Sequence, residues 1–305
     1  MAEQPILILG RTGQLATELC KQFRARGIDF HACGRPDLDV SVEGSVRKAI
    51  DRTNARLVIN AAAYTAVDQA ESEPELAFSV NGDGTRYMAE ACAQRDVPLV
   101  HVSTDYVFNG ADADPYTELA QTDPVGVYGR SKLAGEQAIL GSECKGLILR
   151  TAWVYSAHGK NFVKTMLRLA EARDEISVVN DQIGTPTSAA HLADAISALV
   201  LALESEVANS EGPAPWGVYH CAGRGRASWA DVARQTFEVS RGLGGPSATV
   251  IDIPSSEYPT PVRRPENSQL NCGKIERRFD ITLPHWTEGV YEVVSALLNE
   301  KTGSK

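Results

Sequence analysis

A tyrosine and a lysine four residues apart carry the clearest chemistry in this sequence. Tyr128 and Lys132 belong to the run Val-Tyr-Gly-Arg-Ser-Lys, which apolar and helix-favouring residues follow. In a helix this spacing places both side chains on one face. An ammonium group beside a phenol lowers the phenol pKa from about 10, so we expect Tyr128 to serve as a proton donor. The pair alone is a weak signal, because a half-buried tyrosine and a solvated lysine often have this spacing by chance.

Thr104 is a third catalytic candidate. It follows the apolar stretch 97–102, which predicts a buried strand. A hydroxyl group at the carboxyl end of that strand can reach the space where Tyr128 lies and can bind a substrate carbonyl. A threonine in this place is more often structural when it stands alone. The Tyr128 and Lys132 pair one loop later favours a catalytic triad.

The amino-terminal segment predicts a dinucleotide site. Residues 5–10 form a short β-branched run that ends in glycine, and the sequence Gly-Arg-Thr-Gly-Gln-Leu-Ala follows at 10–16, ahead of a helical pattern. Strand, glycine-rich turn and helix are the context in which backbone N–H groups bind a pyrophosphate. Ala16 replaces the third glycine of the usual fingerprint. A plain tight turn is the alternative interpretation.

The end of the second expected strand, 29–33, bears on the choice between NADPH and NADH. Arg35 stands where NAD enzymes often place an acid that binds the ribose 2′-hydroxyl. Together with Arg11, this guanidinium group suits a 2′-phosphate, so we favour NADPH over NADH. The alternative is that both arginines are merely solvated. Asp39, a few residues later, can bind the adenine amino group.

The order of apolar runs predicts an α/β fold with a doubly wound parallel Rossmann sheet. We expect an NAD(P)-binding domain at 1–150, with later returns to the sheet at about 176–221. Residues 151–305 would form mainly a smaller, sequence-interleaved C-terminal substrate domain. The expected strands are 5–10, 29–33, 57–63, 97–102, 147–155, 176–179 and 217–221, and the expected helices include 41–53, 75–95, 161–172 and 191–203, with a polar loop at 64–74 and Thr187 and Ser188 opening the last of these helices.

Composition excludes several classes of function. The chain has 305 residues and a net charge of −9, which argues against a surface for nucleic acid or for an anionic membrane. The six cysteines form no C-x-x-C pair and the six histidines form no cluster, so a zinc site is not expected. No signal peptide and no apolar run of about 20 residues is evident. We therefore expect a cytoplasmic protein with reduced thiols.

The motifs together resemble those of the extended short-chain dehydrogenases/reductases, most closely the dTDP-4-dehydrorhamnose reductase family, over nearly the whole chain. The last three of the matching pieces are the most specific to the reductases. The pieces are Gly-Arg-Thr-Gly-Gln-Leu at 10–15, Asn-Ala-Ala-Ala-Tyr-Thr-Ala-Val-Asp at 60–68, Ala-Glu-Ser-Glu-Pro at 70–74, Ser-Thr-Asp-Tyr-Val-Phe at 103–108, Val-Tyr-Gly-Arg-Ser-Lys-Leu-Ala-Gly-Glu at 127–136, Asn-Phe at 161–162, Arg-Thr-Ala-Trp-Val-Tyr at 150–155, Asn-Asp-Gln-Ile-Gly-Thr-Pro-Thr at 180–187 and Arg-Pro-Glu-Asn-Ser at 264–268.

This resemblance implies hydride transfer from NADPH or NADH to C4 of a nucleotide-linked 6-deoxy-4-keto-L-sugar. Tyr128 would protonate the alkoxide, Lys132 would hold the nicotinamide ribose, and Thr104 would orient the substrate. The cofactor residues would be Gly10, Arg11, Thr12, Gly13, Gln14, Leu15, Arg35, Asp39, Val40, Ala61, Ala63, Tyr64 and Thr65, with Tyr128 and Lys132. The substrate residues would be Thr104, Asp105, Tyr106, Trp153, Asn161, Gln182 and Arg264.

Some members of that family bind Mg²⁺ at a dimer interface through carboxylates. Glu18 matches one ligand, but Ala190 stands where a second acid belongs, so Mg²⁺ is not favoured, no metal residue is assigned, and a homodimer stays open. Two other functions also stay open. One is reduction of another nucleotide-linked 4-keto-6-deoxysugar. The other is a non-enzymatic NADP-binding regulatory subunit, like the β subunit of methionine adenosyltransferase.

Overall fold

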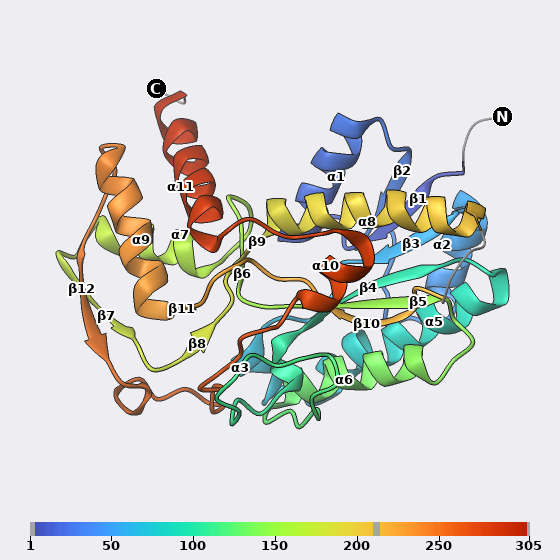
Figure 1. The fold of residues 1–305 in the computed structure, drawn as a ribbon, viewed down its shortest axis with the longest axis horizontal. Coiled ribbons are helices and arrows are strands. Elements are labelled where there is room, and N and C mark those ends of the chain that lie inside the picture. The colour runs from blue at the N-terminus through green and yellow to red at the C-terminus, as the bar shows by residue number, and fades with distance from the viewer. Residues whose placement is uncertain (1–3, 210–213, 304–305) are drawn as a thin grey trace.

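A six-stranded parallel sheet forms the centre of the larger lobe of the computed structural model, which describes residues 4–209 and 214–303 (Figure 1). Every pairing in this sheet is parallel, so the predicted doubly wound parallel sheet is confirmed. The strands lie in the order β10 (Gly217–His220), β5 (Gly146–Thr151), β4 (Leu99–Thr104), β3 (Leu57–Asn60), β1 (Ile6–Leu9) and β2 (Phe30–Cys33).

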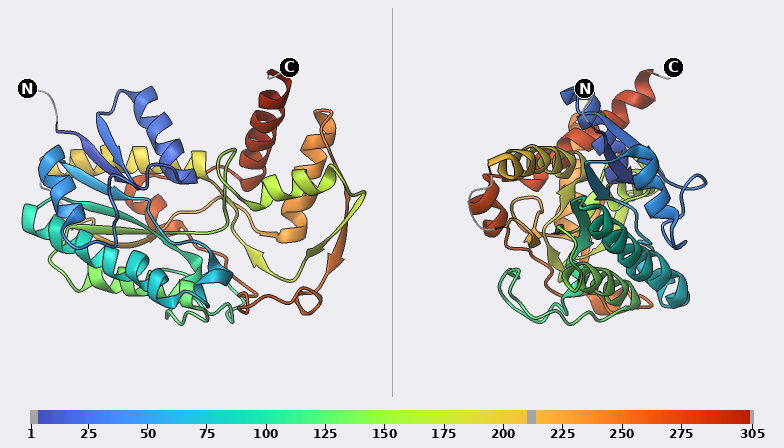
Figure 2. Two further views of the ribbon diagram at one scale, coloured as in Figure 1. Left: turned by 180° about the vertical axis from the view of Figure 1, so that it is seen from behind. Right: turned by 90° about the vertical axis from the view of Figure 1, so that its right-hand side faces the viewer.

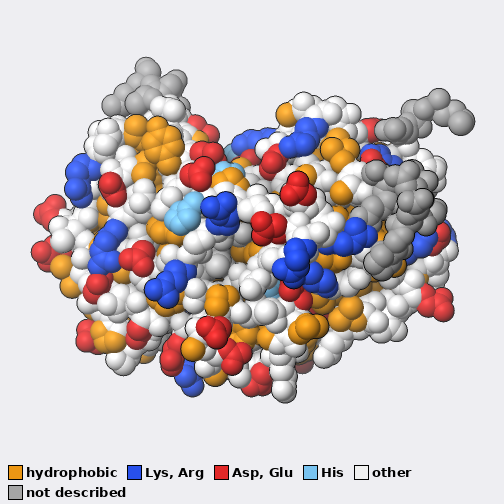
Figure 3. Space-filling model, in the orientation of Figure 1, with side chains coloured by type: hydrophobic (Ala, Val, Ile, Leu, Met, Phe, Trp, Pro, Cys, Tyr) orange, Lys and Arg blue, Asp and Glu red, His pale blue; other side chains and the backbone are white. Residues whose placement is uncertain are grey.

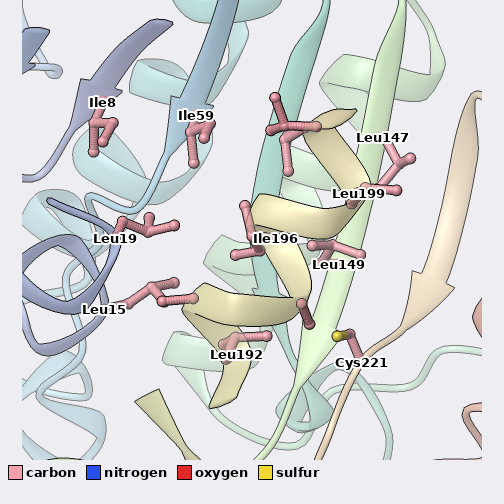
Figure 4. Packing of buried hydrophobic residues seen from close by; sticks show 14 of the residues in the cluster. Ile8, Leu15, Leu19, Ile59, Leu147, Leu149, Leu192, Ile196, Leu199 and Cys221 are labelled. Carbon is pink, nitrogen blue, oxygen red and sulfur yellow. The ribbon is translucent and has the colours of Figure 1, made fainter. Parts of the chain in front are cut away.

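Helices cover both faces of this sheet. Along β1, Ile6 and Ile8 pack on one helical layer, whereas Leu7 and Leu9 pack on the other, because side chains alternate between the faces of a strand. Figure 4 shows Leu192, Ile196 and Leu199 of α8 lying against the strands, in the helical layer that contacts Ile6 and Ile8. That layer is α1 (Gln14–Arg26) and α8 (Ala189–Asn209), and the other is α2 (Ser45–Thr53), α5 (Gly84–Arg95) and α6 (Val127–Leu140).

The ends of β1 and β3 lie side by side at the carboxyl edge of the sheet. Strand β1 has β2 on one side and β3 on the other, so the order in which the strands are added to the sheet reverses here. Open α/β sheets bind their ligands at such a reversal of strand order. Gly10 ends β1 with φ of 111°, and a Cβ atom there would lie 2.8 Å from the backbone of Ala61 and Ala62. Only glycine therefore allows the backbone at the end of β1 to lie this close to the backbone that follows β3.

The segment after β3 is more helical than predicted. The expected polar loop 64–74 contains α3 (Val67–Ala70), and the expected long helix is α4 (Pro74–Phe78), a π-helical turn η1 (Ser79–Asp83) and α5. In that turn Asn81 is 1% exposed; its Oδ1 accepts from Tyr64 N at 2.9 Å, and its Nδ2 donates to Ser131 Oγ at 2.9 Å. The turn thus links the loop after β3 to helix α6 through Asn81, and π turns of this kind are frequent at functional sites.

Two other expected elements differ in length. Helix α2 begins at Ser45 and not at Ser41, because Asp39 Oδ1 accepts hydrogen bonds from Ser41 N and Oγ and holds a turn there. The expected strand 147–155 is divided into β5 and β6 (Val154–Tyr155) by Trp153, whose φ is 47°.

A smaller lobe stands beside the large sheet, on the left in Figure 1 and on the right in the rear view of Figure 2. It contains α7 (Phe162–Ala170), α9 (Trp229–Gly242) and α11 (Trp286–Gly303) and three two-stranded sheets, whereas α10 (Gly273–Phe279) packs on β10. The sheets pair β7 (Glu175–Val179) with β12 (Thr249–Ile253), β8 (Ile183–Gly184) with β11 (Ala227–Ser228), and β6 with β9 (Thr187–Ser188).

The return of the chain to the large sheet begins later than residue 176. Strand β7 pairs with β12 in the smaller lobe, and Thr187 and Ser188 form β9 where they were expected to open a helix. Within 176–221, α8 and β10 rejoin the larger lobe, because their apolar side chains complete the layer beside α1. The division into cofactor and substrate domains at residue 150 stays a prediction.

On the face shown in Figure 3, acidic and basic side chains are interspersed. Within residues 4–209 and 214–303, no helix combines the length and the apolar character that crossing a membrane requires.

Candidate active site

Helix α6 lies very close to the elements at the carboxyl edge of the sheet. A Cβ atom at Gly129 would be 2.1 Å from Tyr106 O, and one at Gly135 would be 2.3 Å from Asn81 O. The start of the helix is held by Glu71, whose Oε1 accepts from Val127 N at 2.6 Å. These contacts fix where the first two turns of α6 present their side chains.

Tyr128 lies in the first turn of α6, beside the end of β4. Its ring makes an edge contact with Tyr106, with centroids 5.5 Å apart, and Tyr128 is 9% exposed. Burial raises the pKa of Tyr128, Thr104 lowers it in part through a hydrogen bond, and the Asp105 charge raises it further. The phenol therefore stays protonated at neutral pH, which is the state that a proton donor needs.

The expected effect of Lys132 on the Tyr128 pKa is wrong for this structure. Lys132 is 2% exposed, and its Nζ donates to Val102 O at 2.7 Å and lies 3.2 Å from His101 Nε2. The groups that shift the Tyr128 pKa do not include Lys132. One turn of α6 separates the two side chains, and Lys132 turns onto the sheet while Tyr128 stays at its edge. Burial lowers the pKa of Lys132 to about 8.

The carboxyl group of Asp105 is also buried, and its charge acts on Tyr128. It is 1% exposed and accepts a hydrogen bond from Thr104 Oγ1 at 2.9 Å, while Thr104 Oγ1 accepts from Tyr106 N at 3.2 Å. Burial raises the pKa of Asp105 to about 6, and its hydrogen bonds with Thr104 and Ser268 limit the rise. The carboxyl group is thus ionised at neutral pH, but at a cost in stability.

Asp105→Asn should therefore change how stability depends on pH. The folded pKa lies above the unfolded one, so the cost of ionising Asp105 is absent below pH 4, grows between about pH 4 and 6, and is fully present above pH 6. The shift sets an upper limit of about 3 kcal/mol for this cost. We expect the free energy of unfolding of Asp105→Asn, relative to the unchanged protein, to be higher at pH 7.5 than at pH 4.5.

Denaturant unfolding at the two pH values measures this difference. Asp112→Asn is the matched control, because Asp112 is exposed, and its effect should stay within about 0.5 kcal/mol at both pH values. A relative stability of Asp105→Asn that is equal at the two pH values would show that Asp105 carries no buried charge.

A pocket of about 210 Å³ lies at the glycine-rich turn. Its walls come from the ends of β1, β2 and β3, at the reversal in strand order. It is lined by nine of the predicted cofactor residues, namely Gly10, Arg11, Thr12, Gly13, Arg35, Asp39, Val40, Ala61 and Ala63, together with Gly34, Leu38, Ala62 and Val80. The small residues leave backbone atoms accessible, so this cradle fits a dinucleotide pyrophosphate.

Six other predicted cofactor residues do not line this pocket. Leu15 is 8% exposed in the core, Gln14 Oε1 accepts from Asn161 Nδ2 at 2.8 Å, and Tyr64 donates its hydroxyl to Glu73 at 2.8 Å. Thr65 is exposed on the loop after β3. The other two are Tyr128 and Lys132. Their cofactor roles stay predictions.

Several predicted substrate residues converge near Tyr128. Arg264 Nη2 donates to Asp68 Oδ1 at 2.6 Å and its Nη1 to the Tyr106 hydroxyl at 3.5 Å, which links the C-terminal part of the chain to the loop after β3. The Tyr106 ring in turn contacts Tyr128. The Arg264 guanidinium is therefore connected to the candidate proton donor through Tyr106.

Trp153 and Gln182 are joined by a residue that sequence reasoning missed, Trp229. The rings of Trp153 and Trp229 stack with centroids 3.6 Å apart, and Trp229 Nε1 donates to Gln182 Oε1 at 3.2 Å. Trp153 Nε1 in turn donates to Ser268 Oγ at 3.1 Å. One indole face of Trp153 is therefore covered by Trp229, and no spacing in the sequence indicates that stack.

Asn161 is engaged within the protein. It caps α7, with its Oδ1 accepting from Lys164 N at 3.1 Å, and its Nδ2 donates to Gln14 and to Ser156 O at 2.7 Å. These bonds explain an asparagine at a helix start without a ligand. Its assignment to the substrate stays a prediction.

Glu18 is surrounded by a lysine, a histidine and a hydroxyl group. Lys21 lies 3.4 Å and His158 3.3 Å from its carboxylate, and Ser156 donates to it at 3.2 Å. Among the residues that have described positions, no group of three or more His, Cys, Asp or Glu is arranged to hold a metal ion. The absence of Mg²⁺ stays a prediction.

Comparison with known proteins identifies the family. The RmlD substrate binding domain family matches residues 4–299. A dTDP-4-dehydrorhamnose reductase of Sinorhizobium fredii is 46% identical over 97% of this chain and 98% of its own. The chain belongs to the dTDP-4-dehydrorhamnose reductase family. A reductase of this family from Escherichia coli K12 is 41% identical over 96% of this chain and 97% of its own.

Solved structures of the reductase family have the same fold. A dTDP-4-dehydrorhamnose reductase from Bacillus anthracis, in complex with NADP, aligns with a TM-score of 0.87 and 33% identity over 96% of this chain and 99% of that one. The Clostridium acetobutylicum member aligns with a TM-score of 0.86 and 36% identity over the same shares. The resemblance read from the motifs is thus confirmed.

Proposed function

We propose that this protein reduces the C4 keto group of dTDP-4-dehydro-6-deoxy-L-mannose to give dTDP-L-rhamnose, with NADPH as the hydride donor. The relatives that share 38–46% of its sequence are named for this reaction, and one solved relative is bound to NADP. The observation that carries the proposal is the meeting of two features at one edge of the sheet. These are the glycine cradle of β1 and a protonated Tyr128 beside Thr104.

The residues of this chain divide the work as follows. Bound NADPH supplies the hydride. Gly10 and its neighbours hold the pyrophosphate, because their backbone N–H groups and small side chains leave the cradle open. Tyr128 donates its phenolic proton to the oxygen that becomes the C4 hydroxyl, and Thr104 orients that oxygen. Burial, which keeps Tyr128 protonated, makes it a donor and not a base in this direction.

Arg35 should decide the preference for NADPH. It lines the cradle beside Asp39, whereas Arg11 already pairs with Asp37 at 3.1 Å. A charge-assisted bond to the 2′-phosphate is worth about 1.5–3 kcal/mol. We therefore expect Arg35→Ala to raise the KM for NADPH by about 10- to 100-fold and the KM for NADH by less than about threefold.

Initial rates with each cofactor at saturating ketosugar measure this effect. Arg47→Ala is the matched control, because Arg47 is an exposed arginine of α2 outside the lining of the cradle, and it should change neither constant. An equal rise in both KM values for Arg35→Ala would mean that Arg35 does not read the 2′-phosphate.

The proposed reaction is tested by incubating purified protein with the dTDP-ketosugar and NADPH, following absorbance at 340 nm, and identifying the product by NMR. We expect cofactor oxidation and dTDP-L-rhamnose. A product with the opposite C4 configuration, or turnover of a different ketosugar only, would change the assigned substrate. No turnover with stable co-purification of a synthetase would favour the regulatory-subunit alternative, which the comparisons do not support.

The substrate class and the setting follow from this function. A nucleotide sugar is the small-molecule partner, and the described residues offer no membrane span. A cytoplasmic location and a homodimer are the remaining parts of the proposal.

A further inference from the structure

A buried polar chain runs from β3 through β4 to Lys132. Asn60, His101 and Lys132 are 1%, 0% and 2% exposed. Asn60 and His101 are neighbours in the parallel register of the two strands. Asn60 Nδ2 lies 2.9 Å from His101 Nδ1, and His101 Nε2 lies 3.2 Å from Lys132 Nζ. Groups as buried as these are stable only when their donors and acceptors match, so the positions of the protons follow from the geometry.

The orientation of Asn60 fixes the tautomer of His101. Asn60 Oδ1 accepts a hydrogen bond from Ala62 N at 3.0 Å. A backbone N–H must meet an acceptor, so the amide oxygen faces Ala62 and the amide NH₂ group faces the imidazole. The NH₂ group only donates, so Nδ1 of His101 accepts and its single proton resides on Nε2. Burial lowers the pKa of His101 well below its ordinary value, so the neutral imidazole is the relevant form.

This tautomer directs an N–H group at Lys132. An ammonium group has three donors and no acceptor, so a charged Lys132 would set two donors against each other. An uncharged amine has a lone pair that accepts from His101 Nε2–H, and it can still donate to Val102 O at 2.7 Å. The chain of hydrogen bonds is therefore complete only when Lys132 is uncharged. Burial of Lys132 acts in the same direction.

One nearby charge opposes this arrangement. The Glu136 carboxylate, one turn further along α6, raises the pKa of Lys132. That carboxylate is paired with Arg150 of β5 at 2.6 Å, which weakens its effect. Many other charged or titratable groups near α6 have separate partners or lie beside Tyr128. They include Glu71, Asp68, Glu73, Asp83, Arg86, Glu90, Arg95, Asp105 and Tyr106.

We propose that His101, oriented by Asn60, is a positioning residue that stabilises the uncharged amine of Lys132 and thereby sets the pH at which this lysine changes charge. Its consequence for catalysis rests on the proposed reductase function. The protonation pattern itself does not, because it follows from the hydrogen bonds of the unliganded chain.

The tautomer is tested directly by NMR of the full-length protein labelled with ¹⁵N-histidine. The chain has six histidines, and the His101 signals are those missing from His101→Gln. We expect Nε2 to be of the protonated type and Nδ1 of the unprotonated type at pH 7. A proton on Nδ1 in the unchanged protein would overturn the proposal, and this measurement requires neither substrate nor turnover.

Asn60→Asp exchanges donors for acceptors along these hydrogen bonds and keeps the size and shape of the side chain at position 60. A carboxylate oxygen facing His101 accepts where the amide donated, so the proton moves to Nδ1 and Nε2 becomes an acceptor for the Lys132 ammonium. We expect the pKa of Lys132 to rise by about one pH unit or more, since a hydrogen bond changes from unfavourable to favourable. Titration of ¹³Cε-labelled lysine measures it, with Lys132→Met identifying the resonance.

A double variant separates the relay from the plain charge of the new carboxylate. In Asn60→Asp combined with His101→Met, the methionine side chain has no ring proton that could move away from Lys132. The rise in the Lys132 pKa should therefore be less than half as large as in Asn60→Asp alone. An equal rise would overturn the proposal. The pH profile of kcat for Asn60→Asp should move upward with the Lys132 titration. Absence of ketosugar turnover in the unchanged protein would instead refute the proposed function and leave the NMR results to decide this inference.

Discussion

Tyr128→Phe should lower kcat for ketosugar reduction by about 10²- to 10⁴-fold, which is the usual contribution of a positioned general acid. The ring of Tyr128 packs edge-on against Tyr106, and phenylalanine keeps that contact. The cradle at Gly10 does not include Tyr128, so the variant should bind NADPH with a Kd close to that of the unchanged protein. Stopped-flow reduction and fluorescence titration of NADPH measure the two effects.

The matched control is Tyr116→Phe. Tyr116 is also a buried tyrosine, 3% exposed, whose hydroxyl donates to Asn109 at 3.2 Å and whose ring stacks on Phe108. It belongs to a different cluster of side chains from Tyr128, so its loss should leave kcat within about threefold. Full activity of Tyr128→Phe would remove Tyr128 as the proton donor.

Glu136→Gln should lower the free energy of unfolding by about 3–5 kcal/mol, because it leaves a buried guanidinium without its counter-charge. The Glu136 and Arg150 side chains are 0% and 5% exposed, and Arg150 donates from Nε and Nη2 to the carboxylate at 2.6–3.2 Å. Ser103 Oγ donates to the same carboxylate. The pair thus joins α6 to β4 and β5 directly behind the candidate site, and denaturant unfolding measures its loss.

An exposed pair gives the control for this change. Glu90 and Arg86 lie one turn apart on α5 at 3.0 Å, with side chains about half exposed, so Glu90→Gln should cost about 0.5 kcal/mol or less. If Glu136→Gln does not fold, the double variant Glu136→Leu with Arg150→Met should fold, because it removes both charges. A loss below about 1 kcal/mol for Glu136→Gln would show that Arg150 finds another partner.

The sequence was sufficient for the sheet and the glycine cradle because each depends on local pattern. Continuous apolar runs such as Ile6–Leu9 specify buried parallel strands, and Gly10 with Gly13 specifies the turn that follows. The family resemblance rests on such motifs, and the comparisons confirm it.

Other features could not be predicted because they depend on contacts between distant segments. Strand β7 pairs with β12 about seventy residues later in the chain, as the Glu175 to Thr249 register shows, and nothing in 175–179 indicates that partner. The orientation of Lys132 depends on its contact with His101. His101 stands out in the sequence as a polar residue inside an apolar strand, but the sequence does not show that Lys132 contacts it. The four-residue spacing on α6 predicted that Lys132 lies beside Tyr128. That spacing does not include the polar groups on β4, Val102 O and His101 Nε2, that the buried amine contacts instead.

The central claim is tested most directly with NADPH that carries two deuterium atoms at nicotinamide C4, incubated with the protein and dTDP-4-dehydro-6-deoxy-L-mannose. Mass spectrometry and NMR of the isolated sugar then locate the label. The account predicts dTDP-L-rhamnose with one deuterium atom at sugar C4, formed rapidly by the unchanged protein and very slowly by Tyr128→Phe. Unconsumed cofactor, or a product without deuterium at C4, would contradict it.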